Sequence, residues 1–582
     1  MRVGLVCALL AAATVHAEST VFNGDPLTIV ETVGSQYARI EPVLVGSDGT
    51  TPALRLTTHT VPPNPESVGA YGARARWWPV AAEKGDLILV SVWLRCVEPV
   101  DGECITRFVV ERNTDPYTKS SDPILAIGPQ WQNARFAFRM AEGYAARGYR
   151  LEFWLGYQKQ AFEVAGFDVN NYGPDANPVD LGVESGYAGH APDAAWRAAA
   201  AGRIDKLRKG DLAVEVRDAQ GRPVPGAHVR ARMTRHEFGF GSAVTAAGLL
   251  DPGATNDIYR EKVKELFNTV VFENDLKWPS WERERARPLQ AIGWLNANGI
   301  GRVRGHTLVW PGWQYLPQSI QALRNDPETL RARVVEHVRD EASALSGRLI
   351  EWDVVNELTT NRDLQNVLGE GVVADWFRAA RESDANAGLC LNDYNILSAG
   401  GANIPHQNYY FNALRGLIDA GVPVTCAGMQ GHFSTPTAPE RMLQVLDRFA
   451  QLGLRLRITE YDINTADEQL QADFTRDILT VAFSHPAVDQ FLMWGFWEGR
   501  HWRPDAAMYR RDWTEKPNGA IWRKMLFEEW WTDDSGEANG EGRFTTRGFT
   551  GDYAVEVSLG DRRASVEAKL SARGETVVIP LP

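Results

Sequence analysis

The stretch Ile350-Glu351-Trp352-Asp353-Val354-Val355-Asn356-Glu357 begins like a buried strand and ends in polar side chains. Runs of this kind alternate with amphipathic helical patterns through residues 235–533, for example at Pro327–Leu345 and Arg441–Leu452. The strand candidates begin near Phe238, Thr269, Val303, Ile350, Leu389, Cys426, Leu456 and Phe491. Eight alternating units predict an α/β fold in which a parallel sheet closes into a (β/α)8 TIM barrel. An open doubly wound sheet is the poorer alternative, because the stretch contains no glycine-rich phosphate loop.

The segments on either side of residues 235–533 follow different patterns. Residues 18–173 consist of alternating strand-like runs punctuated by turn residues, which predicts a β-sandwich. Residues 174–209 are rich in Pro, Gly and Ala around a helical stretch, and we interpret them as a connector. Residues 210–234 alternate around the turn Asp218–Gly221 and predict a β-hairpin. Residues 534–582 are short strands that we expect to pack with this hairpin in a small C-terminal β domain.

Charge and the N-terminus limit the partners and the compartment. The formal net charge of −13, with no basic stripe, argues against a nucleic-acid partner. Met1-Arg2, an apolar run over Val3–Val15 and a small residue at Ala17 predict a signal peptide at residues 1–17. The run is too short to span a bilayer, and no other apolar stretch is long enough, so we expect no membrane insertion. We therefore expect a secreted monomer, either periplasmic or extracellular.

Four cysteines remain once Cys7 is removed with the signal peptide. Cys96 and Cys104 flank the turn-like stretch Pro99–Gly102 and could face each other across a hairpin. A disulfide is one interpretation in an oxidising compartment, and two buried thiols are the other. None of the four, which include Cys390 and Cys426, has the spacing of a zinc site.

Polar and aromatic residues occupy seven consecutive strand ends of the predicted barrel. Active-site residues of such barrels come from the carboxyl ends of the strands, so these side chains should form one ring around one mouth. Aromatic planes with convergent hydrogen-bonding groups suit a polyhydroxylated ligand. The stretches at these ends are Phe272–Asn274, Gly305–Trp310, Trp352–Glu357, Leu391–Asn395, Met429–His432, Ile458–Asp462 and Trp494–Trp497.

With these motifs, residues 235–533 resemble glycoside hydrolase family 10, the endo-β-1,4-xylanases. The matching motifs are E-N-D-L-K-W (Glu273–Trp278), R-G-H-T-L-V-W (Arg304–Trp310), W-D-V-V-N-E (Trp352–Glu357), L-N-D-Y-N (Leu391–Asn395), Q-G-H (Gln430–His432), I-T-E-Y-D (Ile458–Asp462) and the pair Trp494 and Trp502. More diffusely, residues 18–173 resemble the jelly-roll carbohydrate-binding modules that are often fused to glycanases. Candidate sugar-stacking residues there are Trp77, Trp78, Trp131 and Tyr157, although one of Trp77 and Trp78 should face the core.

The resemblance implies a retaining mechanism with Glu357 as acid/base and Glu460 as nucleophile. Strands four and seven lie across the barrel mouth from each other, so their ends could supply the two carboxyl groups that retention requires. The resemblance also assigns Asp462 as a support for His432 and Asn356 as the partner of the sugar 2-hydroxyl. The implied substrate-binding residues are Glu273, Asn274, Lys277, His306, Trp310, Asn356, Tyr394, Gln430, His432, Trp494 and Trp502. This mechanism requires no metal and no other cofactor, and the expected partner is xylan or a related β-1,4-linked polysaccharide.

Two departures from the family pattern concern the subsites. Pro311-Gly312-Trp313 follows Trp310 where the family has His, and Asp275 replaces a Glu. Three alternatives stay open at this point. The chain could act on another β-1,4-glycan by the same mechanism, or bind xylan without hydrolysing it. A metallohydrolase is the third, but the sequence has no His-Glu-x-x-His pattern.

Overall fold

The structure is a computed structural model that describes residues 17, 19–46, 49–62, 70–98, 103–181, 183, 187–465 and 467–582. Residues 1–16 of the expected signal peptide therefore lie outside the described residues. The chain divides into two compact units, of which one holds the residues up to Tyr187 with the short segment Ala402–Pro405, and the other holds the rest. Among the described residues, no helix combines the length and the apolar character needed to cross a membrane.

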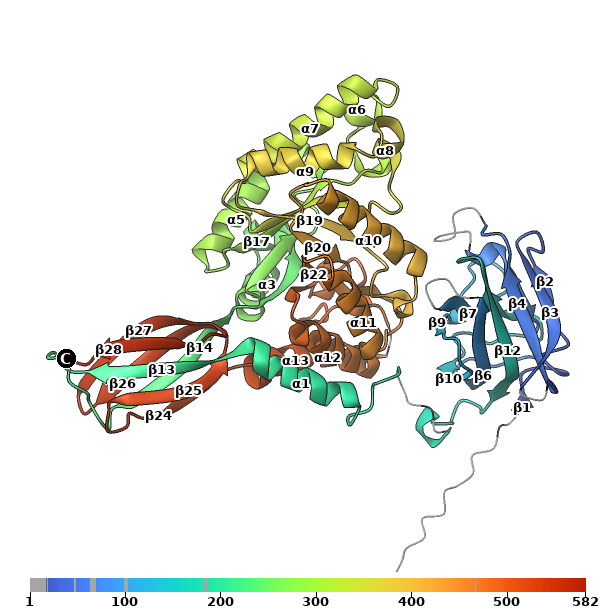
Figure 1. Cartoon of the computed structure of the whole chain (residues 1–582), viewed down its shortest axis with the longest axis horizontal. Helices are drawn as coiled ribbons and strands as arrows, with labels where there is room; N and C mark the ends of the chain where they lie inside the picture. Colours follow the sequence, from blue (N-terminus) through green and yellow to red (C-terminus); the bar gives the residue numbers. More distant parts are fainter. Residues whose placement is uncertain are drawn as a thin grey trace, which may run out of the picture. The chain divides into compact units, whose positions relative to one another are not determined.

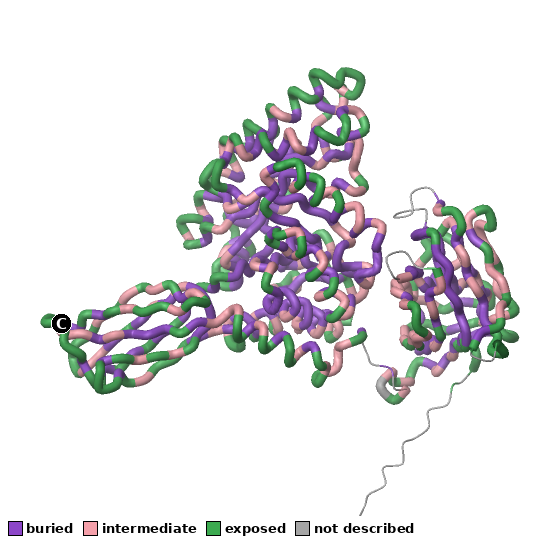
Figure 2. Tube along the Cα trace, viewed as in Figure 1, coloured by how far each residue is buried: buried purple, intermediate pink, exposed green. Residues whose placement is uncertain are grey.

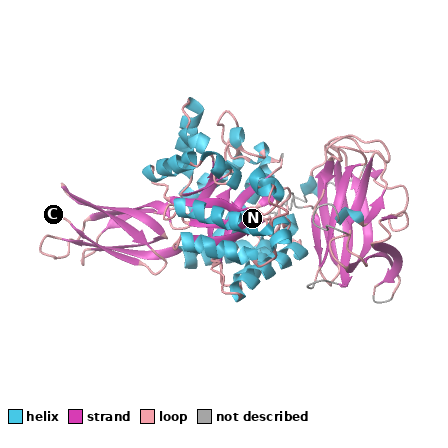
Figure 3. Cartoon of the chain, turned by 90° about the horizontal axis from the view of Figure 1, so that it is seen from above, coloured by secondary structure: helices cyan, strands magenta, loops and turns pink. Residues whose placement is uncertain are grey.

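The N-terminal unit is a sandwich of two antiparallel sheets (Figure 3). One sheet contains β1 (Ser19–Thr20), β3 (Ala38–Val45), β4 (Thr51–Thr58), β6 (Leu87–Glu98), β10 (Gln132–Arg139) and β12 (Gln160–Asn171). The other contains β2 (Glu31–Val33), β5 (Arg74–Trp77), β7 (Cys104–Arg112), β8 (Lys119–Ser121), β9 (Ile124–Ile127) and β11 (Tyr149–Trp154). The two antiparallel sheets confirm the predicted β-sandwich.

Aromatic side chains fill the space between the two sheets. Trp77 is fully buried and meets Phe153 and Phe167 edge-on, with ring centroids 5.8 and 5.1 Å away. Of the four stacking candidates, Trp77 and Tyr157 are thus wrong, because both are buried. The strand alternation missed Trp93, whose side chain is 44% exposed on β6.

Cys96 and Cys104 form a disulfide, but they do not pair across a hairpin. Cys96 lies on β6 and Cys104 on β7, and these strands belong to opposite sheets. The bridge therefore ties the two layers of the sandwich together. A second disulfide, which the sequence spacing did not indicate, joins Cys390 to Cys426.

The second unit contains the predicted barrel, whose parallel strands close on themselves (Figure 1). Its strands are β15 (Gly239–Val244), β16 (Thr269–Phe272), β17 (Arg302–Val309), β18 (Glu351–Asn356), β19 (Gly388–Asp393), β20 (Cys426–Met429), β22 (Arg455–Ile463) and β23 (Val488–Met493), with the short β21 (His432–Phe433) beside β22. Pairing of β15 with β23 and of β20 with β22 completes the circle. All eight predicted strands lie within a few residues of an observed one.

Helices cover the outside of the barrel, and buried residues concentrate on its strands (Figure 2). The helices are α2 (Ala246–Leu250), α3 (Ala254–Leu266), α4 (Trp278–Glu284), α5 (Ala286–Ala297), α6 (Gln318–Gln321), α7 (Pro327–Ala344), α8 (Asp363–Leu368), α9 (Val372–Ser383), α10 (Ile404–Asp419), α11 (Pro439–Ala450), α12 (Glu468–Ser484) and α13 (Pro517–Lys524). Residues such as Met442, Val445 and Phe449 on α11 are buried at helical spacing, as the amphipathic pattern predicts.

The helix of the expected connector, α1 (Ala195–Arg208), is attached to the barrel unit. Arg197 on α1 makes a bidentate ion pair with Asp477 on α12, at 2.7 and 2.8 Å. Arg208, at the end of α1, donates to the carbonyl of Phe483 at 2.8 Å. This part of the expected connector is therefore integrated into the second unit.

The predicted hairpin at residues 210–234 needs correction. Hydrogen bonds close the turn at Asp218–Gly221, but β13 (Lys209–Arg217) and β14 (His228–His236) then enter different sheets. Pro223 and Pro225 follow the turn and have no N–H to continue a ladder. β13 pairs with the tail strands β25 (Arg543–Phe549) and β28 (Glu575–Pro580), and β14 pairs with β24 (Asp533–Glu537) and β26 (Gly551–Leu559), which carries β27 (Arg562–Leu570).

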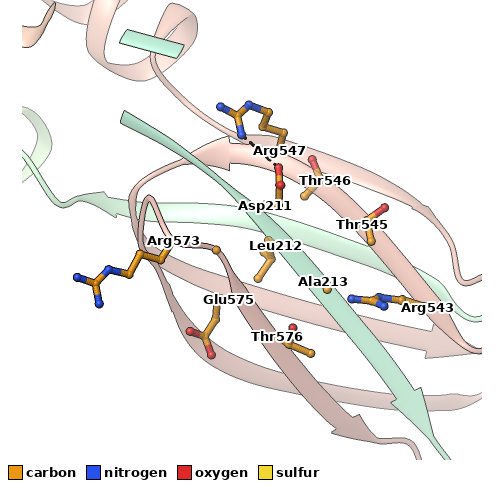
Figure 4. A pocket seen from close by; sticks show the side chains of 11 residues that line it. Asp211, Leu212, Ala213, Arg543, Thr545, Thr546, Arg547, Arg573, Glu575 and Thr576 are labelled. Carbon is orange, nitrogen blue, oxygen red and sulfur yellow. Dashed lines mark hydrogen bonds and ion pairs between the residues drawn. The ribbon is translucent and has the colours of Figure 1, made fainter. Parts of the chain in front are cut away.

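A shallow groove of about 750 Å³ lies on the sheet of β13, β25 and β28 (Figure 4). Arg543, Thr545 and Arg547 on β25 line it beside Asp211 on β13. Arg547 is paired with Asp211 at 3.3 Å. None of the predicted site residues lines this groove, so it is separate from the ring of strand ends.

Candidate active site

Glu357 directly follows β18, where its backbone has a positive φ of 56°. Three N–H groups point at its carboxyl group. Gln430 Nε2 donates to Oε1 at 3.1 Å, whereas Trp310 Nε1 and Asn361 Nδ2 donate to Oε2 at 3.2 and 3.0 Å. The left-handed backbone is unusual for a residue with a Cβ, and the surrounding bonds hold the side chain in one orientation.

The environment of Glu357 favours the protonated carboxyl group. Burial is the main cause and raises its pKa to about 7, with a further contribution from the charges of Asp393 and Glu460. The hydrogen bond from Gln430 opposes this effect. A carboxyl group that titrates near neutral pH can both donate and accept a proton.

Glu460 lies on β22 and is 4% exposed. Asn392 Nδ2 donates to its Oε1 at 2.7 Å, and His432 Nε2 lies 3.2 Å from its Oε2. Burial would raise the pKa of Glu460, but the bond from His432 and the attraction of His306 outweigh it, and the pKa lies below its ordinary value. Glu460 is therefore ionised at neutral pH.

A chain of amide groups joins the two carboxyl groups. Gln430 Nε2 lies within hydrogen-bond distance of both Glu357 Oε1, at 3.1 Å, and Asn356 Oδ1, at 3.3 Å. Asn392 Nδ2 donates to Asn356 Oδ1 at 3.0 Å as well as to Glu460. Both acidic side chains therefore belong to one buried network at the carboxyl ends of β18, β19, β20 and β22.

Comparison with known proteins identifies the family of the chain. The family model described as glycosyl hydrolase family 10 matches residues 230–522, half of the chain. The chain belongs to glycosyl hydrolase family 10. The anti-sigma-I factor RsgI6 of Acetivibrio thermocellus is 33% identical over 375 residues, which cover 62% of this chain and 47% of that protein. Endo-1,4-beta-xylanase 1 of Arabidopsis thaliana is 28% identical over 360 residues, which cover 61% of this chain and 37% of that protein. The chain thus spans less than half the length of these two relatives. The solved structure of xylanase 10B from Thermotoga petrophila in complex with xylobiose is 26% identical, with a TM-score of 0.46, and covers 50% of this chain and 95% of that one.

On one side of Glu460, the family 10 barrel places a charged imidazole. His432 Nδ1 lies 3.0 Å from Asp462 Oδ2, and its Nε2 faces Glu460. Trp502 Nε1 donates to the same Asp462 oxygen at 2.7 Å, and its ring lies 4.8 Å from that of His432. Asp462 therefore orients both His432 and Trp502, whose indole is 49% exposed.

On the other side, His306 lies next to a buried ion-pair network. Its Nδ1 is 2.9 Å from Asp353 Oδ2, and Asp353 also pairs with Arg304. The ring of Trp494 meets His306 edge-on at 5.1 Å. His306 is therefore held by a carboxylate that stands behind it.

The residues after β16 form a further charged cluster in the family 10 site. Lys277 Nζ donates to Asn274 Oδ1 at 2.9 Å and lies 5.1 Å from the centre of the Trp310 ring. Burial lowers the pKa of Lys277, while the charges of Glu460, Glu273 and Glu357 oppose that shift. The ammonium group of Lys277 therefore interacts electrostatically with all three carboxyl groups.

Tyr394 is the predicted residue nearest the loop that follows Glu357. Its hydroxyl donates to Thr360 Oγ1 at 3.1 Å, and its ring meets His406 edge-on at 4.8 Å. Tyr394 therefore lies directly after β19, beside the loop that follows Glu357.

Three residues of the network were missing from the predicted set. Asn392 bridges the two halves of the site, Asp353 holds His306, and Asn361 contacts Glu357. Asn392 and Asp353 occur in the quoted motifs, Asn392 near the end of β19 and Asp353 within β18, so their place in a motif was an available signal. Asn361 lies in a loop outside every motif, and only the folded geometry reveals it.

Two clusters in the described part of the chain bring potential metal ligands within 4.8 Å of one another. The first consists of His306, Asp353 and Glu460, whose facing atoms are engaged in the hydrogen bonds described above. The second combines Glu351 with Cys390 and Cys426, but the two sulfur atoms are joined in a disulfide. Both clusters therefore already have a role in the hydrogen-bonded or covalent structure.

Proposed function

We propose that the chain is a retaining endo-1,4-β-xylanase that hydrolyses internal bonds of xylan through a covalent glycosyl-enzyme. One observation carries the proposal: within a single hydrogen-bonded network, the pKa of Glu357 is raised to about 7 and that of Glu460 is lowered. Two carboxyl groups with opposite pKa shifts are the arrangement that acid-assisted nucleophilic displacement at a sugar carbon needs.

In the first step, the ionised Glu460 attacks the anomeric carbon, and the bond to the leaving oxygen breaks as Glu357 transfers its proton to that oxygen. The product is a glycosyl ester on Glu460, which has lost its negative charge. This loss lowers the pKa of Glu357, because the charge of Glu460 contributes to raising it. Glu357 then accepts a proton from water, the water oxygen attacks the anomeric carbon, and Glu460 leaves as a carboxylate.

Asn356 supports the same assignment. Its Nδ2 group is buried and donates no hydrogen bond to any residue that the structure describes, although its Oδ1 accepts from Asn392 and Gln430. An unpaired buried donor costs free energy, so a substrate hydroxyl that accepts from it would be bound favourably. The family resemblance gives this residue the sugar 2-hydroxyl, whose contact strengthens in the transition state.

The test is product analysis on xylan, arabinoxylan, mixed-linkage glucan and cellulose, with Glu460→Ala and Glu357→Ala measured beside the native chain. We expect xylo-oligosaccharides that are first released as β-anomers, observed by NMR, and no turnover of xylan by Glu460→Ala. Release of α-anomers, or xylan hydrolysis by Glu460→Ala, would contradict the mechanism.

The alternatives predict other results in the same assay. Turnover of a glucan in preference to xylan would keep the mechanism and change the substrate. Binding without hydrolysis is the second alternative, since one relative is named an anti-sigma factor rather than a hydrolase. In that case xylan in the gel would retard the native chain in affinity electrophoresis, but incubation with xylan would release no reducing sugar.

We further propose that the protein is exported and that its N-terminal sandwich binds polysaccharide. The two disulfides support export, because such bonds persist mainly in oxidising compartments.

For polysaccharide binding, the observation is that Trp93 is exposed and pairs across strands with Asn133. Trp131 precedes Asn133 by two residues and so lies on the same face. Xylan in the gel should no longer retard Trp93→Ala in affinity electrophoresis, whereas hydrolysis of a soluble xylobioside should be unchanged.

N-terminal sequencing of protein from the culture medium tests export.

A further inference from the structure

The segment that departs from the family pattern lies next to the acid/base residue. Where the family has His after Trp310, this chain continues with Pro311-Gly312-Trp313, followed by Gln314. Gln314 Nε2 donates to Asn361 Oδ1 at 3.1 Å. Asn361 Nδ2 in turn donates to Glu357 Oε2 at 3.0 Å. Two loops thus supply amide groups close to Pro311, the position at which the family has a histidine.

Gly312 leaves the space in which these amides meet. A Cβ atom at this position would lie 2.6 Å from Asn361 Oδ1 and 3.0 Å from Gln314 Nε2. Contacts below 3.0 Å force a neighbour to move, so any larger residue would displace the amide pair. The glycine in the departing segment is therefore matched to Asn361 and Gln314.

Backbone hydrogen bonds fix the two loops to each other. The N–H of Trp313 donates to Asp363 Oδ2 at 2.8 Å, and the N–H of Leu364 donates to the carbonyl of Pro311 at 3.1 Å. The N–H of Asn361 also donates to the carbonyl of Glu357 at 3.0 Å. Asn361 is thus anchored to the residue whose side chain it contacts.

We propose that Asn361, held in place by Gln314, is a positioning residue that fixes the orientation of the Glu357 carboxyl group at Oε2. The proposal rests on Glu357 being the acid/base. In the structure the Asn361 amide presents its N–H₂ group to Glu357 and its Oδ1 to Gln314 Nε2. Turning the Asn361 amide by itself would lose both bonds, so this orientation of Gln314 supports the one in which Asn361 donates to Glu357.

A donor at Oε2 also affects proton transfer. A hydrogen bond to the ionised carboxylate favours that form. We therefore expect the bond from Asn361 to act in the same direction as the bond from Gln430, which opposes the rise in the pKa of Glu357 caused by burial. This favours the second half of the reaction, in which Glu357 must be a base. Other titratable groups around Glu357 are Asp393 on β19, Glu460 on β22, His432 on β21, Lys277 after β16 and Tyr315 after β17.

The first test measures the pKa of Glu357 without substrate, by carbon NMR of labelled glutamate carboxyl groups with Glu357→Gln for assignment. Asn361→Leu should raise this pKa by about one unit, since a donor to the charged form is lost. Gln314→Met should raise the pKa of Glu357 by a smaller amount. Because Gln314 is exposed, this variant should fold, and it tests the proposal even where Asn361→Leu does not fold. Gln318→Met, the same change at another exposed position, is the control and should leave it unchanged.

The second test uses aryl β-xylobiosides with leaving groups of graded acidity. Asn361→Leu should lower kcat/KM about tenfold for poor leaving groups, which need the acid, and little for good ones, with KM nearly constant. Equal losses for all leaving groups together with an unchanged Glu357 pKa would overturn the proposal. Absence of hydrolysis by the native chain, with the NMR shift intact, would contradict the proposed function and leave the positioning role standing.

Discussion

The Nε2 atom of His432 lies 3.2 Å from Oε2 of Glu460, and the two residues have opposite pKa shifts. Burial would lower the pKa of His432, but Asp462 and Glu460 raise it to about 9. The pKa of Glu460 is lowered although its side chain is buried. At neutral pH the pair is therefore an imidazolium and a carboxylate, and Glu460 keeps its charge although burial disfavours it.

Replacing His432 by Ala should shift the acidic limb of the pH profile. Without the imidazolium, burial raises the pKa of Glu460, so a larger fraction is protonated and inactive at low pH. We expect the acidic limb of kcat/KM on an aryl β-xylobioside to move upward by about one pH unit or more, with the largest loss of activity below it. The exposed His228 on β14 provides the control, His228→Ala. An acidic limb that stays in place would mean that His432 does not set the charge of Glu460.

Asn356→Ala should lower kcat more than it changes KM. We proposed above that its Nδ2 binds a substrate hydroxyl, a contact that strengthens in the transition state, and losing this contact should cost about 100-fold in kcat/KM. Because Asn356 also contacts Asn392 and Gln430, a 2-deoxy substrate separates the two roles. On that substrate the native chain and the variant should differ much less. A loss of equal size on both substrates would show that Asn356 only supports the network.

The sequence predicted the barrel better than the surrounding parts, for a physical reason. Barrel strands such as β16 combine an apolar run with polar residues directly after it, and both features are local. The partition of β13 and β14 into two sheets depends on pairing with strands more than 300 residues later in the chain, and local alternation cannot encode such pairing. The same distinction holds in the site. Glu357 and Glu460 lie in motifs, whereas the contact of Asn361 with Glu357 depends on two loops whose conformations only the fold defines.

Glu341→Leu should stabilise the protein at neutral pH. Glu341 on α7 is fully buried, and within the described part of the chain neither of its carboxyl oxygens accepts a hydrogen bond. His337 Nε2 lies 3.4 Å away but faces the carbonyl of Leu308 at 2.9 Å, and burial lowers the pKa of His337 to about 3, so it carries no charge. Burial raises the pKa of Glu341 well above its ordinary value.

The sign follows from proton binding. Since the folded state holds the Glu341 proton more tightly than the unfolded state, stability falls as pH rises from about 4.5 toward the raised pKa. Glu341→Leu removes this loss and should increase the free energy of unfolding at pH 7 by about 1–3 kcal/mol, measured in urea at pH 4 and pH 7. The difference between variant and native chain should be smaller at pH 4. An equal or larger difference there would contradict the assignment.

Removing the bridge between Cys390 and Cys426 should destabilise the barrel unit while leaving kcat nearly unchanged. The bridge joins the neighbouring strands β19 and β20 and closes a segment of 36 residues, for which loss of the link costs about 4 kcal/mol in the chain-entropy estimate. Calorimetry of the Cys390→Ala/Cys426→Ala double variant should therefore show a lower Tm for the barrel transition. The matched control is Cys96→Ala/Cys104→Ala, which lies in the other unit and should lower only the transition of the N-terminal sandwich. If both double variants lowered the same transition, the two units would not unfold separately, and the assignment of each bridge to one unit's stability would fail.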